Sequence, residues 1–282
     1  MAAESSTGRF SVMDRLENIG LKRIIGAYFL FAVIYIYAPI ISIIVFSFNQ
    51  GGITAPFTGI TLESYGVLFA DESIRASIVR SIQLALAVTV VATLLSTAAG
   101  LAYRYDFRGK RPFLYLLILG IITPGVTYGV GSQLFLTEIL SLPQQLWLAI
   151  PVHVVWAVPF AVIVILAGFP PNLRQNEQAA RVMGADTITI YREIVIPQIA
   201  PTVLGAAVFA FTLSYNEAER GLLLVGQDNT MPTQIFAVAS ADRATPDMFA
   251  LGSLTTILST ILLLIAGWLV LKGVSQSQAT DD

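Results

Sequence analysis

The sequence has 282 residues, of which 55% are hydrophobic and only 12% are charged, and its formal net charge is −2. Because soluble domains carry about 25% charged residues, this composition excludes a single water-soluble globule and predicts a protein whose solvent is mostly lipid. The small net charge argues against nucleic-acid binding, which needs a concentrated basic surface. The absence of cysteine excludes disulfides, thiolate catalysis and cysteine metal sites.

Six apolar segments are long enough to cross a hydrocarbon core of about 30 Å as helices of about 20 residues. They lie at residues 24–48, 79–102, 113–136, 147–168, 202–226 and 250–271. A backbone in lipid must satisfy its own hydrogen bonds, and these segments are too long for barrel strands of about ten residues. The sequence therefore predicts an all-α polytopic membrane protein with one six-span domain over residues 24–272.

The first segment is interpreted as an uncleaved span. Signal-peptide cores run to about 15 residues, whereas this stretch is much longer and no small-x-small cleavage site follows it. A short N-terminal segment, 1–23, precedes it, and a tail, 273–282, follows the last span.

Basic residues predict the orientation of these spans. Twelve of the sixteen lysines and arginines precede span one or lie between spans two and three, between spans four and five, or after span six: Arg9, Arg15, Lys22, Arg23, Arg104, Arg108, Lys110, Arg111, Arg174, Arg181, Arg192 and Lys272. Because basic loops stay on the cytosolic side, both termini are expected in the cytosol of a multi-pass inner or plasma membrane protein.

Turn-rich sequence fills the opposite side. Residues 49–78 form one external loop, with a short helix expected at Leu62–Phe69, and residues 226–247 form the second. Glycine and proline also interrupt the spans, most densely around Pro124 and Gly125 in the third. Two interpretations stay open there: close packing of small residues between helices, or a bend along a translocation route.

The loop between spans four and five, residues 170–201, is predicted to be a helix-turn-helix. Pro170 and Pro171 stop the preceding helix, and Asn172 is placed to cap a new one. Gly184 is expected to end that helix, after which Asp186 or Thr187 caps the next. Pro197 and Pro201 mark the return to the membrane.

This loop carries more apolar residues than a solvated connector needs. They are Leu173, Ala179, Ala180, Val182, Met183, Ile188 and Ile190. A plain connector between two spans is one interpretation. The other is a short helix covered by a cytosolic partner protein, and the apolar content favours it.

The same loop resembles the signature of permease subunits of ATP-binding-cassette (ABC) importers, which reads E-A-A, three residues, Gly, nine residues, I-x-L-P. The matching residues are Ala179, Ala180, Gly184, Ile194 and Pro197. Ile196 replaces the leucine, and Gln178 stands where the family has glutamate, with Glu177 beside it. The resemblance implies a coupling helix docked on an ATPase subunit, through Glu177, Gln178 and the five matching residues.

Weaker motifs widen this resemblance to nearly the whole chain. Residues 46–49 at the exit from span one, 103–110 after span two and 211–214 in span five are similar to the C-type permeases of spermidine/putrescine importers. The resemblance implies a type I importer permease fold and a polyamine solute. It also implies a second permease subunit, an ATPase dimer, an extracytoplasmic solute-binding protein and alternating access driven by ATP.

No energy-yielding or catalytic site is visible in the sequence. A phosphate-binding loop needs Gly-x-x-x-x-Gly-Lys followed by Ser or Thr, and the three lysines do not fit it. No catalytic triad, metal-ligand cluster or paired carboxylates emerge, so an enzyme, a cofactor and a metal are not expected. The single histidine, His153, is a functional candidate because it lies inside a span, although a neutral packing role is favoured.

Polar and charged residues gather near the end of span five: Tyr215, Asn216, Glu217, Glu219 and Arg220. Asn216 lies fourteen residues after Thr202, about 21 Å along a helix, which predicts the outer half of the membrane. A charge facing lipid there costs about 2.5–3.5 kcal/mol, so these side chains are expected to face the bundle interior.

Two interpretations of this cluster stay open. Glu217 and Arg220, spaced i, i+3, could form a structural ion pair that closes the helix, with Glu219 pointing elsewhere. Alternatively, the acidic and polar groups could line the pathway of a cation.

Three rival functions follow from the sequence. A permease of the same class could carry another small solute, and an ion-coupled secondary transporter would need paired broken helices or ionisable relays. An intramembrane enzyme lacks a candidate set of residues.

Overall fold

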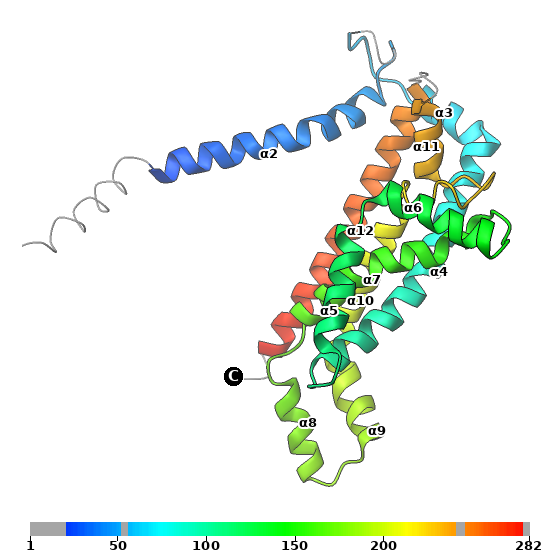
Figure 1. Ribbon diagram of the computed structural model, residues 1–282. Coiled ribbons are helices and arrows are strands. Elements are labelled where there is room, and N and C mark those ends of the chain that lie inside the picture. The colour runs from blue at the N-terminus through cyan, green and yellow to red at the C-terminus, as the bar shows by residue number, and fades with distance from the viewer. Residues whose placement is uncertain (1–20, 52–55, 241–245, 279–282) are drawn as a thin grey trace, which may run out of the picture.

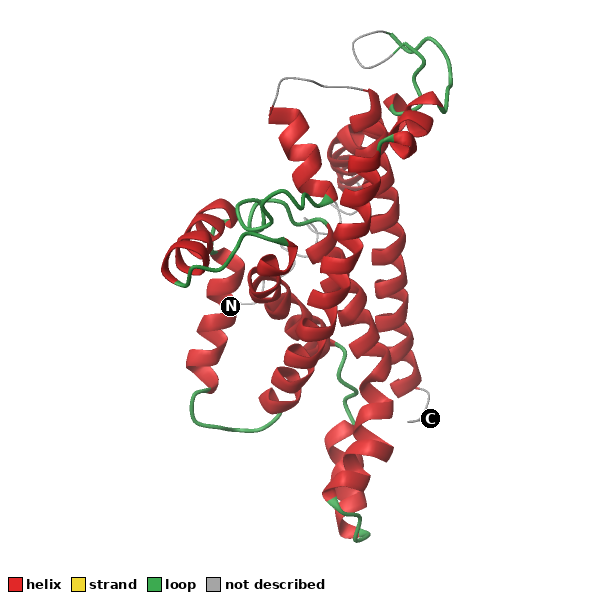
Figure 2. Cartoon of the chain, turned by 90° about the vertical axis from the view of Figure 1, so that its right-hand side faces the viewer, coloured by secondary structure: helices red, strands yellow, loops and turns green. Residues whose placement is uncertain are grey.

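The computed structural model describes residues 21–51, 56–240 and 246–278, and these ranges are mostly helical (Figures 1 and 2). The helices are α2 (Leu21–Phe46), α3 (Glu63–Ala70), α4 (Glu72–Tyr103), α5 (Lys110–Ile122), α6 (Gly125–Gln133), η1 (Leu134–Ile139), η2 (Leu146–Ala149), α7 (Ile150–Ala167), α8 (Leu173–Val182), α9 (Thr187–Thr189), η3 (Ile190–Val195), α10 (Ile196–Tyr215), α11 (Met231–Ser240) and α12 (Pro246–Gln278). The only β pairing within these ranges is an isolated bridge between Asn49 and Ile60. Most of the predicted segment 1–23, with Arg9 and Arg15, lies outside the described residues, as do the last residues of the tail.

Five helical stretches are long and apolar enough to span a membrane, and a sixth is broken. The broken span is α5 followed by α6 and η1, which meet at an angle of 102°. Pro124 stands at the break, and Thr123 before it is extended, as a residue preceding proline prefers to be. The predicted six-span all-α architecture is confirmed, and the third span is bent.

The core of the bundle forms where α4, α7 and α10 pack against one another. Its largest cluster joins Leu84 and Val88 of α4 to Val152 of α7 and Ala210 of α10. Several alanines at the contacts are fully buried: Ala85, Ala92, Ala157, Ala161, Ala206 and Ala210. Small side chains let membrane helices approach closely, which explains why so apolar a chain packs through alanine.

The first span, α2, stands apart from this core. Figure 1 shows α2 leaving the bundle at the end where α3 and α11 lie. Its main partner is α12, where Ile43 lies beside Gly252. The described residues bury no residue of its most apolar stretch. The apolar surface of α2 is therefore free for lipid or for another protein.

The predicted fifth span, 202–226, is wrong at its C-terminal end, because α10 stops at Tyr215. Asn216 donates from its side chain to the Thr212 carbonyl oxygen at 2.9 Å, and the Glu217 carboxylate accepts from the backbone N–H of Arg220 at 3.0 Å. Side chains that bind nearby backbone groups compete with helix continuation. Residues 216–230 consequently form turns, and the apolar run from Leu222 to Val225 is not helical.

Candidate functional site

Two regions carry the candidate functional residues, and the first is the loop formed by α8, α9 and η3. Gly184 follows α8 with a φ of +87°, the left-handed conformation that ends helices and that glycine adopts most easily. Asp186 then caps α9 by accepting from the backbone N–H of Ile188 at 3.2 Å. The Thr189 hydroxyl donates to Asp186 and holds the pKa of that carboxyl below its usual value. The predicted helix-turn-helix is confirmed.

The inner face of α8 packs within the loop itself. Leu173 and Ala180 are buried against Ile190, Val195 and Ile199. The outer face of the loop has no cover among the described residues: Val182, Met183 and Ile188 are 89%, 80% and 76% exposed. Part of the apolar content is thus explained by the loop's own core, and the remainder is presented to solvent.

Glu177 faces its own chain. Its carboxylate lies 2.6 Å from Nη2 of Arg104, the residue that follows α4, with side-chain exposures of 6% and 13%. Arg104 also lies over the Phe169 ring at 5.6 Å. Among the residues that the structure describes, Arg104 Nη1 has no hydrogen-bond partner, so the contact of the guanidinium with Glu177 runs through Nη2. This pair ties α8 directly to α4.

The other candidate coupling residues divide by exposure. Gln178, Ala179, Gly184 and Pro197 are exposed, whereas Ile194 is half-buried. Ala180, described above, is buried in the loop core. The exposed members could contact another protein, and the buried ones support the loop.

The second region is the turn that follows α10. Tyr215, the last residue of the helix, is buried, and its hydroxyl donates to the Met231 sulfur at 3.7 Å. The Asn216 side chain exchanges hydrogen bonds of 2.9 and 3.0 Å with the Ser259 hydroxyl of α12. These contacts fix the end of α10 against α11 and α12.

Glu217 and Arg220 form a buried ion pair. Arg220 Nη1 donates to Glu217 Oε2 at 2.9 Å. The Glu217 side chain is 7% exposed and the Arg220 side chain is 9% exposed. Arg220 Nη2 donates to the Thr123 carbonyl oxygen at 3.2 Å, at the break of the third span. The guanidinium carbon lies 3.7 Å from the centre of the Trp156 ring on α7, a cation–π contact.

Glu219, in the same turn, is exposed, and no ion pair involves it within the described residues. Gly125 and Gly129 of α6 let this turn approach. A β-carbon on Gly129 would lie 2.9 Å from the Glu219 carbonyl oxygen, and one on Gly125 would lie 3.2 Å from Arg220 Nη1. The turn therefore packs directly on the glycine face of α6.

His153 is fully packed beside this turn. Its Nδ1 is 2.9 Å from the Ser214 hydroxyl, while the buried Nε2 has no hydrogen-bond partner in the described part of the chain. A β-carbon on Gly221 would lie 2.8 Å from that Nε2. These contacts agree with the favoured packing role of His153. No group of three metal-ligating side chains lies together in the part of the chain that the structure describes.

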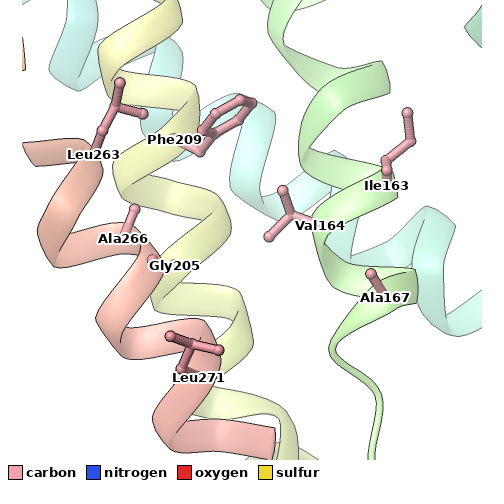
Figure 3. A pocket seen from close by; sticks show the side chains of 9 residues that line it. Ile163, Val164, Ala167, Gly205, Phe209, Leu263, Ala266 and Leu271 are labelled. Atoms are coloured by element: carbon pink, nitrogen blue, oxygen red, sulfur yellow. The ribbon is translucent and has the colours of Figure 1, made fainter. Parts of the chain in front are cut away.

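An apolar groove of about 440 Å³ lies elsewhere, between α7 and α12 over α10 (Figure 3). Its lining residues are Ile163, Val164, Ala167, Gly205, Phe209, Leu263, Ala266, Gly267 and Leu271. These lining side chains are all apolar, so they cannot replace the water molecules that a cation would lose on entering the groove. The charged turn after α10 is the stronger candidate for solute contact.

Residues 92–273 match the family described as binding-protein-dependent transport system inner membrane component. The chain belongs to this family. The matched range contains the α8–α9 loop, the bent third span and the turn after α10. The protein is a membrane-spanning permease subunit of an ABC importer, which excludes the secondary transporter considered from the sequence.

Curated relatives extend over most of the chain. The spermidine/putrescine transport system permease protein PotC of Escherichia coli K12 is 29% identical over 253 residues, 88% of this chain and 93% of its own. The putrescine transport system permease protein PotI of the same strain is 25% identical, over 86% of this chain and 89% of its own.

A solved bacterial ABC transporter involved in import of the acidic polysaccharide alginate has the same fold. It superimposes with a TM-score of 0.67 at 15% identity and covers 93% of this chain and 99% of its own. A second structure is the alginate transporter in complex with an alginate-bound periplasmic protein, with a TM-score of 0.55 at 15% identity, covering 92% of this chain and 95% of its own.

Sequence reasoning missed three contributors to these sites. Arg104 enters the sequence analysis as a basic residue of the loop after span two and as part of the 103–110 motif, and no local pattern marks it as the partner of Glu177. Trp156 and Thr123 had no local signal as partners of Arg220, because they reach it only through the packing of α7 and the bend after α5.

Proposed function

We propose that this permease carries a polyamine, spermidine or putrescine, through the bundle. The observation that carries the proposal is the acidic cluster at the end of α10, where Glu217 and Glu219 outnumber Arg220 next to a helix that itself carries no charged residue. A pathway with excess carboxylate favours a cation over an anion or a neutral sugar. The names of the PotC and PotI relatives support the same solute class.

The exposed part of the α8–α9 loop is the proposed docking surface for an ATPase dimer. We call Gln178, Ala179, Val182, Met183, Gly184 and Ile188 the coupling surface. Apolar residues exposed this strongly need a protein partner outside the membrane. ATP-driven movement of the partner would move α8 and, through the Arg104–Glu177 pair, α4.

The two ends of the molecule differ in charge, and this difference supports a proposal for the orientation and for the remaining partners. The basic residues Arg104, Arg174 and Arg181 belong to loops at the α8 end, which supports a cytosolic position for that end and for both termini. The opposite end, with α3 and α11, would receive the extracytoplasmic solute-binding protein (Figure 1). A second permease subunit would complete the pathway and cover part of α2.

Replacing Gly184 by aspartate is expected to abolish uptake while the protein still inserts. The left-handed backbone costs an L-residue about 1–2 kcal/mol, and a charge appears within the apolar coupling surface. Uptake of radiolabelled putrescine and co-purification of the ATPase measure the effect. Gly109→Asp is the matched control, since Gly109 has a φ of +97° and equally open surroundings. Equal loss in both variants would contradict a docking role.

Replacing Glu219 by glutamine is expected to raise the KM for putrescine severalfold with little change in maximal rate. Glu219 is the exposed carboxylate of the cluster, so its charge is available to attract the solute. Initial uptake rates in vesicles, measured over a range of putrescine concentrations, give both constants. Glu63→Gln removes an exposed carboxylate from α3 and serves as control. Unchanged kinetics for Glu219→Gln would argue against a cation pathway at this turn.

A further inference from the structure

Three groups that contact the Arg220 guanidinium share one property, which is affinity for cations. Glu217 supplies a carboxylate oxygen at 2.9 Å, Thr123 a backbone carbonyl oxygen at 3.2 Å, and Trp156 an aromatic face at 3.7 Å. They come from three separate segments: the turn after α10, the end of α5, and α7. Nothing in this arrangement requires the cation to be attached to the chain.

We propose that Glu217, the Trp156 ring and the Thr123 carbonyl oxygen form a receptor for a protonated primary amine, which Arg220 fills with its own guanidinium in this conformation. The proposal rests on the proposed function and deepens it. Arg220 then acts as a tethered competitor of the solute. It does not act only as a structural partner of Glu217.

Because Glu217 is buried, one ammonium group must replace the Arg220 guanidinium when Arg220 leaves. The Glu217 side chain is only 7% exposed, and a carboxylate in such a place cannot stay ionised without a partner. When Arg220 moves out, an ammonium group must take its place or the site must close. An incoming primary amine donates three hydrogen bonds, enough for the carboxylate and the carbonyl, while its charge faces the Trp156 ring.

Glu219 explains why the favoured ligand would carry two amines. The two carboxylates of the turn are balanced by a single guanidinium, which leaves one negative charge in this cluster. Gly125, without a side chain, leaves room for both the Glu219 carboxylate and the Arg220 guanidinium beside α6. Once Arg220 has left, a diamine neutralises Glu217 with one end and Glu219 with the other.

The test measures thermal unfolding of the assembled transporter in nanodiscs for the natural protein, Arg220→Ala and the double variant Arg220→Ala/Glu217→Gln. The probes are n-butylamine, which carries one ammonium, and 1-butanol as its neutral counterpart. Butylamine is expected to raise the Tm of Arg220→Ala by about 3 °C or more through binding to the folded state. Butanol should not raise it, and butylamine should have no effect on the natural protein or on the double variant.

Equal butylamine effects in all three proteins, or none in Arg220→Ala, would overturn the receptor. The assay does not depend on the transported solute. A butylamine response without polyamine uptake would remove the proposed solute and leave the receptor intact. Polyamine uptake without a butylamine response would remove the receptor and leave the proposed solute intact.

A second variant, Arg220→Lys, keeps the charge and so protects the fold. Lysine lacks the planar fork of arginine, and the tethered cation loses about one hydrogen bond. As a weaker competitor, it is expected to lower the KM for putrescine about two- to tenfold. An unchanged or higher KM would show that Arg220 does not compete with the solute.

Discussion

Replacing Glu177 by lysine is expected to abolish ATP-driven uptake in a permease that still inserts into the membrane. The new ammonium would face the Arg104 guanidinium, where the natural side chains are 6% and 13% exposed and 2.6 Å apart. Breaking a buried ion pair costs about 3–5 kcal/mol, because one charge stays buried and unpaired. The loss should therefore detach α8 from α4 before it affects the distant turn after α10.

The measurement is uptake together with ATP hydrolysis by the reconstituted complex, so that coupling is obtained as solute moved per ATP. The charge-swapped variant Arg104→Glu/Glu177→Arg should regain part of the uptake, since it restores opposite charges across the same contact. Asp106→Lys makes the same charge change at a fully exposed position in the adjacent loop, and near-normal uptake is expected there. A charge-swapped protein as inactive as the single variant would show that the pair does not transmit the motion.

Replacing Gly129 by leucine is expected to destabilise the protein strongly and to stop uptake. Even its β-carbon would lie 2.9 Å from the Glu219 carbonyl oxygen and 3.1 Å from that of Arg220, and backbone atoms cannot rotate away. Overpacking of this kind costs about 1–3 kcal/mol, and here it also displaces the Arg220 guanidinium from Glu217 and Thr123. The Tm of the complex should fall by roughly 5 °C or more.

Gly131→Leu is the matched control for that experiment. It lies two residues further along α6, and a β-carbon there would meet nothing within 4 Å. Leucine is also a better helix former than glycine by nearly 1 kcal/mol, so a neutral or slightly raised Tm is expected. If both glycines tolerate leucine equally, α6 does not pack on the turn as described.

The α8–α9 loop could be predicted closely because its signals are local. Pro171, Gly184 and Asp186 each act on the backbone within a few residues, and the structure places helix start, helix end and cap where those residues indicate. The partner of Glu177 could not be predicted in this way. Arg104 reaches it across a fold that brings the end of α4 beside α8, which no local pattern encodes.

In the turn after α10, the side-chain contact was accessible from the sequence, whereas the end of the helix was not. The i, i+3 spacing of Glu217 and Arg220 allows an ion pair, one of the two interpretations that the sequence leaves open, and the structure contains that pair. Hydropathy nevertheless predicts a span that continues to residue 226, because the apolar run from Leu222 to Val225 extends the apolar sequence of the span. Hydropathy reports burial or lipid contact and not helix continuity, whereas the hydrogen bonds of Asn216 and Glu217 decide where α10 ends.

The contact between α2 and α12 has a consequence for how the chain is made. Ile43 belongs to the first span and Gly252 to the last, so this contact forms only after nearly the whole chain has left the ribosome. At synthesis rates of about 5–20 residues per second, α2 waits on the order of ten to fifty seconds for α12. A mean hydropathy of 2.6 lets α2 remain inserted alone during that time. In the nascent protein, α2 is thus held by the membrane before it is held by α12.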